Sequence, residues 1–127
     1  MSRIYMRRNT LTDATFETFL SDINRLADYK AVRDVALPEL LEDLDMSLVH
    51  CRHTFTCVNR FEGRDPALRI QCPLGFMPSV IDIEFPQGRH VYRIKHASQV
   101  LIITGLEELV KNLRIILTMS WAHARAL

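Results

Sequence analysis

The sequence predicts an α+β fold: an N-terminal helix and a short second helix, a four- or five-stranded antiparallel meander, and a long C-terminal helix packed on one sheet face. Near both ends of the chain, apolar residues recur at three- and four-residue steps, the spacing of an amphipathic helix. Between these ends, apolar and polar residues alternate, which is typical of half-buried strands. Short connections separate the strands, and short connections favour antiparallel neighbours.

Length and composition indicate one globular domain. The chain has 127 residues, of which 48% are hydrophobic and 24% charged, and it contains only 4 Gly and 5 Pro. These proportions are those of an average folded protein and exclude disordered or collagen-like chains. We therefore expect a single domain over residues 1–127.

The first helix is predicted from about Asp13 to Tyr29. Thr10 or Thr12 can cap it, and Asp13 and Glu17 lie near the positive end of its dipole. Its apolar face consists of residues at helical spacing, namely Phe16, Phe19, Leu20, Ile23, Leu26 and Ala27.

A second, short helix is predicted over Asp34 to Asp45. Pro38 suits a first helical turn because its ring fixes the backbone angle φ. Leu40, Leu41 and Leu44 follow at helical spacing.

Alternating residues then predict four antiparallel strands. The first is a long strand over Val49–Phe61, with one apolar and one polar parity. The turn chemistry of Glu62–Pro66 predicts a hairpin to a second strand. Two more strands are predicted around residues 81–85 and 92–95, on either side of a Pro-Gln-Gly turn.

Val100–Ile103 is either a fifth strand or an early turn of the last helix. Its β-branched residues and the following Gly105 favour the strand. The last helix is predicted from Leu106 to Trp121. Thr104 with Glu107 has the spacing of a capping box.

Cysteine usage and the N-terminus bear on the compartment. Three cysteines at Cys51, Cys57 and Cys72 are an odd number without the spacing of a disulfide scaffold, so we expect reduced thiols in the cytosol or nucleus. Residues 1–9 lack the apolar run of a secretory signal. No apolar stretch approaches the ~20 residues of a membrane-spanning helix, so a soluble protein is expected.

Residue patterns do not indicate an enzyme. Cys51, His53 and Cys57 would share a strand face, but the second ligand pair of a structural zinc site is missing, and buried strand residues are favoured. Glycine-rich phosphate loops, dinucleotide fingerprints and hydrolase motifs are not found. We therefore predict no catalytic residue, no metal and no cofactor.

Two candidate binding regions follow from the expected elements. Residues 48–98 carry seven basic and four acidic side chains, and five of these cations take the polar parity of their strands: Arg52, Arg60, Arg69, Arg93 and Lys95. A one-sided sheet would bring them together as a basic face able to contact phosphates or an acidic protein. The alternative is a solvated face neutralised by Asp82 and Glu84.

The last helix carries apolar residues beyond one stripe, because Ile115, Met119 and Ala122 fall outside its main face. A helix that is apolar on most sides is buried on most sides. The cover is either a second protein or the sheet and first helix of the same chain. Under the first alternative, we expect the interface to include Leu113, Ile116, Leu117 and Trp121.

The sequence therefore predicts a non-enzymatic protein-interaction module, such as an adaptor, chaperone or inhibitor, acting as a homodimer or within a complex. The alternative is nucleic-acid binding through the basic sheet face. A small-molecule enzyme ranks third, and would need a pocket holding two or more histidines and thiols.

Overall fold

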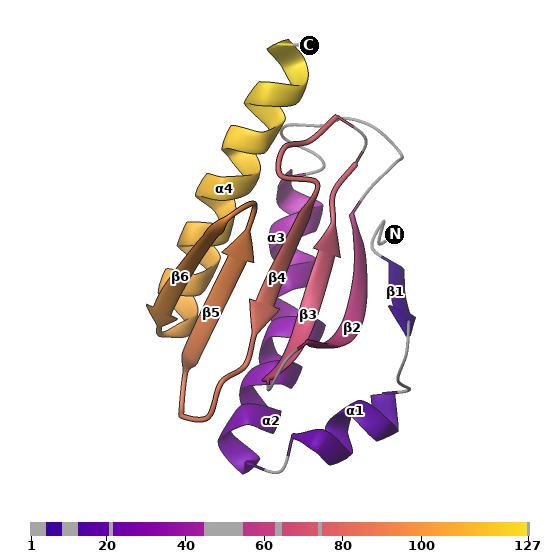
Figure 1. The fold of residues 1–127 in the computed structure, drawn as a ribbon, viewed down its shortest axis with the longest axis vertical. Helices are drawn as coiled ribbons and strands as arrows, with labels where there is room; N and C mark the ends of the chain where they lie inside the picture. Colours follow the sequence, from indigo (N-terminus) through magenta and orange to yellow (C-terminus); the bar gives the residue numbers. More distant parts are fainter. Residues whose placement is uncertain are drawn as a thin grey trace.

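In the computed structural model of the protein, one six-stranded sheet is covered on one face by helices (Figure 1). The structure describes residues 5–8, 13–20, 22–44, 55–62, 65–73 and 75–126, and side chains within 15–20, 22–44, 55–60, 65–73 and 75–120. The elements are β1 (Tyr5–Arg8), α1 (Asp13–Phe19), α2 (Ile23–Ala31), η1 (Val32–Ala36), α3 (Leu37–Leu44), β2 (Thr56–Glu62), β3 (Asp65–Gln71), β4 (Val80–Glu84), β5 (Val91–His96), β6 (Gln99–Thr104) and α4 (Leu106–Ala126).

The sheet has the strand order β1-β2-β3-β4-β5-β6, and β2 to β6 form an antiparallel meander, which confirms the predicted α+β fold. The segment Val100–Ile103 is strand, lying within β6. Strand β1 was not predicted. It pairs in parallel with β2, and Tyr5 lies opposite Thr56. The four residues of β1 are too few to show an alternating pattern, and their strand partner is distant in the sequence.

The predicted first helix is two helices. Asp22 is the N-cap of α2, and its side chain accepts a hydrogen bond from the Asn24 backbone N–H at 2.9 Å. Asp favours this position because its short side chain competes with the helical backbone for such donors. The predicted caps Thr10 and Thr12 lie outside the described residues.

From Ile23 to Leu44 the chain is one helical rod with a π-helical stretch, η1, in its middle. The Leu37 backbone N–H donates to the Val32 carbonyl, five residues back. The next residue, Pro38, has no N–H to continue the α-helical ladder, and the wider π turn accommodates this loss. The expected second helix therefore exists as α3, joined to α2 rather than separated from it.

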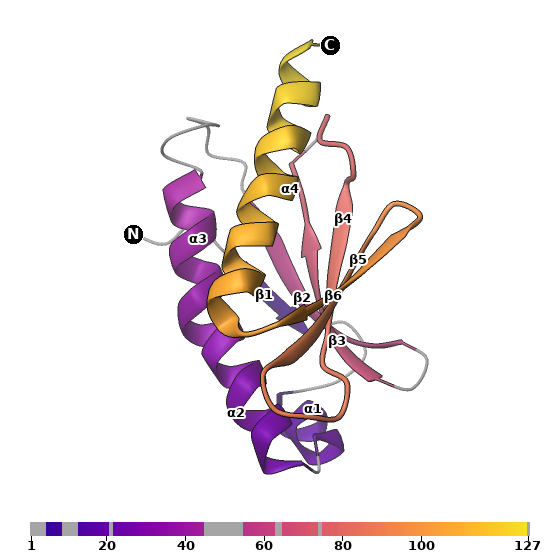
Figure 2. The ribbon, with the colours of Figure 1, turned by 90° about the vertical axis from the view of Figure 1, so that its left-hand side faces the viewer.

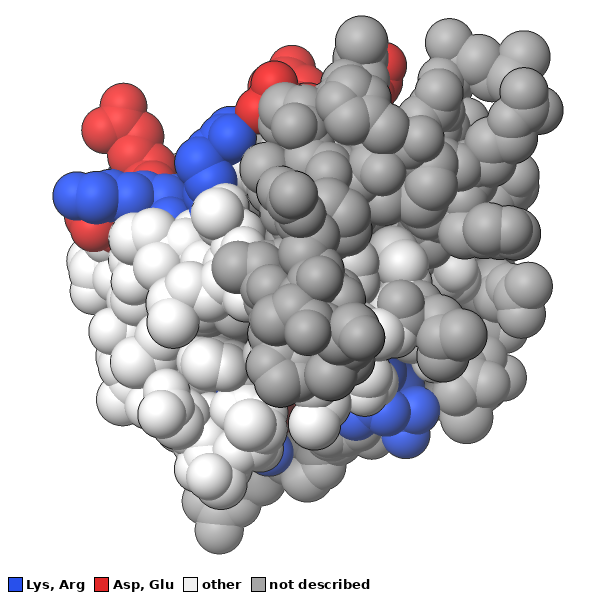
Figure 3. All heavy atoms as spheres, turned by 90° about the horizontal axis from the view of Figure 1, so that it is seen from above, with Lys and Arg blue, Asp and Glu red and all other residues white. Residues whose placement is uncertain are grey.

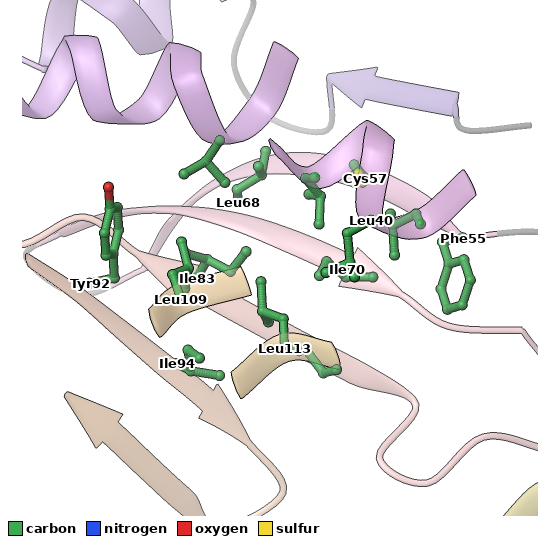
Figure 4. Close-up of a cluster of buried hydrophobic side chains, with 14 of the residues drawn as sticks. Leu40, Phe55, Cys57, Leu68, Ile70, Ile83, Tyr92, Ile94, Leu109 and Leu113 are labelled. Carbon is green, nitrogen blue, oxygen red and sulfur yellow. The ribbon is translucent and has the colours of Figure 1, made fainter. Parts of the chain in front are cut away.

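The core lies between the sheet and the helices (Figure 4). Sheet residues such as Ile70, Ile83 and Ile94 are fully buried beneath Leu109 and Leu113 of α4. In Figure 1, α3 lies behind β3 and β4, whereas α4 lies behind β5 and β6 at the other end of the sheet. The opposite sheet face, called the outer face below, carries no helix among the described elements.

Candidate interaction surface

Polar side chains of neighbouring strands meet on the outer face. Arg69 of β3 lies opposite Asp82 of β4, which lies opposite Lys95 of β5. In the next row, Glu84 of β4 lies opposite Arg93 of β5. We call these five residues the charged strip. The same parity that predicted a basic face thus places acidic residues among the cations.

Ion pairs join the strip from strand to strand. The Arg69 guanidinium donates two hydrogen bonds to the Asp82 carboxylate, from Nε to Oδ1 at 2.8 Å and from Nη2 to Oδ2 at 2.9 Å. Arg93 binds both Glu84 and Asp65, and these contacts raise the pKa of its guanidinium, the Glu84 hydrogen bond being the larger cause. Bidentate contacts of this kind hold the side chains in fixed positions.

The remaining predicted cations differ in their surroundings. Lys95 Nζ lies 3.5 Å from a Glu84 oxygen, and 44% of its side chain is exposed. Arg60 is partly buried on β2 and has interactions of its own. Arg52 lies outside the described residues. The described outer face thus holds three carboxylates, those of Asp65, Asp82 and Glu84, among four of the predicted cations. These cations are Arg60, Arg69, Arg93 and Lys95.

The predicted interface residues of the last helix face inward. Leu113, Ile116 and Leu117 are all buried in the chain's own core. Trp121 belongs to α4, but its side chain lies outside the described residues. The described part of the stripe is therefore covered within the chain by the sheet and α3. The alternative of a cover by the sheet and the first predicted helix is right about the sheet, but the helix beside α4 is the second predicted one, because α3 continues α2 along the sheet.

One flank of α4 faces α3. Arg114 Nη1 contacts the Asp43 carboxylate of α3 at 2.7 Å. Leu106 and Val110 line a hollow of about 570 Å³ between the two helices. Because successive helical residues are about 100° apart, Glu108, Asn112, Ile115 and Met119 lie on the other flank, which points away from α3.

Strand β6 is the last in the order of the described strands and forms an open sheet edge among them. Alternate residues of an edge strand leave their backbone N–H and C=O groups without a strand partner. On its outer face, Val100 is 53% exposed and Ile102 is 74% exposed. No residue from Gln99 to Thr104 is charged, and none is proline. This strand therefore lacks the features with which proteins commonly block edge-to-edge pairing.

The open edge of β6 and the free flank of α4 point to the same side of the molecule. Figure 2 looks straight at this side, with α4 beside β6 and no described element in front of them. On α4, Ile115 is 50% exposed and Met119 is 68% exposed. We call Val100, Ile102, Ile115 and Met119, together with the β6 backbone edge, the β6 edge surface.

Seen from above, charged side chains gather at the upper left of the molecule, and uncharged side chains make up the rest of its visible left-hand part (Figure 3). Of the four residues on the free flank of α4, only Glu108 is charged. Exposed apolar residues on one side of a protein, here Val100, Ile102, Ile115 and Met119, are typical of a site of protein association. The exposed members of the predicted last helix thus define a different surface from its predicted interface residues.

A carboxylate and an imidazole meet beneath the β4–β5 connection. Asp28 of α2 is buried, and its Oδ2 accepts a hydrogen bond from the His90 backbone N–H at 2.7 Å. Its Oδ1 lies 2.7 Å from Nδ1 of the His90 ring. His90 has a φ of 57°, the left-handed region. The two contacts hold this strained residue against α2.

Two thiols lie at one end of the β2–β3 pair: Cys57 is the second residue of β2, and Cys72 directly follows β3. Burial raises the pKa of both Cys57 and Cys72 to about 12, and the neighbouring Cys57 adds to the effect at Cys72. Thiols in such surroundings stay protonated and unreactive at neutral pH. A hollow of about 580 Å³ on the outer face is lined by Arg69, Lys95 and His96, but by no thiol.

Within the described ranges, no group of three or more His, Cys, Asp or Glu residues is placed to hold a metal ion. Cys51 and His53 of the considered zinc set lie outside those ranges. None of the described helices combines the length and apolarity needed to cross a membrane. Comparisons of the chain with protein-family models, curated proteins and solved structures give no match.

Proposed function

We propose that the chain is a non-enzymatic protein-interaction module, of the adaptor, chaperone or inhibitor type, that acts as a homodimer or within a complex. The β6 edge surface carries this proposal. It combines unpaired backbone groups with four exposed apolar side chains, Val100, Ile102, Ile115 and Met119. Backbone groups supply hydrogen bonds for an added strand, and apolar side chains supply the favourable burial.

The charged strip supports nucleic-acid binding less well. Its guanidinium groups already bind carboxylates of neighbouring strands, as Arg69 binds Asp82. Phosphate binding by these groups would require the ion pairs to break. The described outer face also lacks exposed aromatic side chains on which bases could stack. The described outer face therefore supports nucleic-acid binding less well than the β6 edge surface supports protein binding.

Site-specific photo-crosslinking in cells tests the proposal. A photoreactive amino acid replaces Ile102, and a matched chain carries it at Glu42, which is exposed on α3. Position 102 should form a defined adduct with a protein, identified by mass spectrometry, and Ile115→Lys in the same chain should reduce its yield. Equal adducts from both positions, or no adduct at position 102, would contradict the proposed function.

A further inference from the structure

We infer that the β6 edge surface binds a second copy of the same chain. The two β6 strands pair antiparallel around a two-fold axis perpendicular to the sheet, so that the two six-stranded sheets become one. This inference rests on the proposed function and commits it to one partner.

Pairing a strand with its own copy places chemically identical residues near one another. Like charges in such positions would repel, and a central proline would remove a backbone donor. From Gln99 to Thr104 the strand has neither. The edge is therefore compatible with itself, a condition that many exposed edge strands fail to meet.

The alternation of side chains restricts the register. Residues directly opposite in an antiparallel pair lie on the same sheet face. With Leu101 at the axis, Val100 of each copy lies opposite Ile102 of the other on the outer face. Both residues are exposed in the single chain, and this pairing buries them against each other. Cross-strand pairs of β-branched residues stabilise sheets.

The position of α4 fits the same axis. This helix lies behind β5 and β6 (Figure 1). Joining the sheets through β6 therefore separates the two α4 axes by about two strand spacings, or about 10 Å. Packed helices lie about 8–10 Å apart. Near the axis the two helices would thus lie within contact distance of each other.

The helix flank in contact is the one that points away from α3. Besides Glu108 and Asn112, it presents Ile115 and Met119, which an added peptide strand alone would leave exposed. Six strand residues span about 20 Å, the length of about 13 helical residues. The stretch of α4 beside β6 therefore runs from Leu106 to about Met119. A second copy covers both the edge and this flank, which favours it over a single extended peptide.

Sedimentation velocity of the full chain over a range of concentrations tests the inference. The wild type should sediment as a dimer, and Ile102→Lys should weaken association by about 100-fold or more, because it places two like charges in the paired edge. Ile115→Lys should act in the same direction. Ile23→Lys is the matched control: Ile23 is 79% exposed at the start of α2, and this variant should remain dimeric.

Hydrogen exchange supplies the second measurement. Backbone amides of Gln99–Thr104 that gain a strand partner should exchange more slowly in the dimer than in the Ile115→Lys monomer, whose β6 is intact. A chain that is monomeric at all concentrations would overturn the inference, and so would a dimer unaffected by Ile102→Lys. A crosslink from position 102 to a different protein would then leave the proposed function standing.

Discussion

The charged strip and the β6 edge surface lie on the same sheet and differ in what their neighbours supply. Strand β4 lies between two strands, and its Asp82 and Glu84 find cations on β3 and β5. Among the described strands, β6 has a neighbour on one side only, and no strand lies beyond its exposed Ile102. Charged side chains that could bind another molecule can thus already be paired with side chains of neighbouring strands. The surface available to another molecule is the one at the edge, where the next strand is absent from the described sheet.

Breaking the strip should have the largest effect. Arg69→Ala leaves the Asp82 carboxylate, whose side chain is 8% exposed, without its bidentate partner. Removing one member of a buried ion pair leaves the other charge buried without a partner, so the free energy of unfolding should fall by about 3 kcal/mol. Urea unfolding of the monomeric Ile102→Lys background measures this without a contribution from association.

The double variant Arg69→Ala with Asp82→Ala provides the control. Because it leaves no unpaired charge, it should lose less stability than the sum of the two single variants. Additive losses would show that the two side chains do not act as a pair. The strip would then not be the self-contained network that the comparison requires.

Alkaline pH should have an intermediate effect. Burial raises the pKa of Cys57 to about 12, so the folded chain keeps a proton that the unfolded chain releases near its ordinary pKa. The resulting stability is complete at lower pH and is lost as the pH rises from about 9 toward about 12. Burial and the nearby charge of Asp28 raise the pKa of Tyr92 as well, which adds to the loss.

Comparison with Cys57→Ala isolates the thiol. The variant should be less stable near neutral pH because of the lost side-chain volume, but its unfolding free energy should fall less steeply above pH 9, by about 1 kcal/mol per pH unit. Urea unfolding at several pH values provides this slope. Equal slopes in both chains would show that the Cys57 thiol does not remain protonated in the fold.

The smallest effect is expected at the rim of the strip. Lys95 lies 3.5 Å from Glu84 and its side chain is 44% exposed, so Lys95→Ala should change the free energy of unfolding by less than about 0.5 kcal/mol. The dimer should also persist. A loss as large as that from Arg69→Ala would mean that the contact between Lys95 and Glu84 stabilises the fold as much as the pair of Arg69 and Asp82 does.

Alternation made much of the fold predictable. The parity of Arg69, Asp82, Arg93 and Lys95 predicts their common face, and β-branched residues at 100–103 predict the last strand, as the structure confirms. Neutralisation of the cations by Asp82 and Glu84 was an open alternative. The structure decides it, because only the register between strands shows which charges meet.

Other features could not be predicted from local pattern. Asp22 suits the polar face of a continuous helix as well as it suits an N-cap, so the sequence did not show that a new helix begins there. Strand β1 depends on pairing with residues about 50 positions away. The surface of α4 was predicted through its apolar stripe, but a stripe at helical spacing is equally what a core requires. Ile115 and Met119, outside the stripe, were the signal for a second surface.

By itself, the sequence determined which regions after residue 13 are helical and which are strands, and the two side-chain parities of the strands, because periodicity is a local property of the chain. It did not determine where the helical region between Asp13 and Leu44 breaks and continues. Only the tertiary structure decided which parity was covered, which charges were paired and which edge was left open. Those outcomes depend on neighbours far apart in sequence. For that reason the β6 edge surface emerged from the fold, although each of its residues was visible in the sequence.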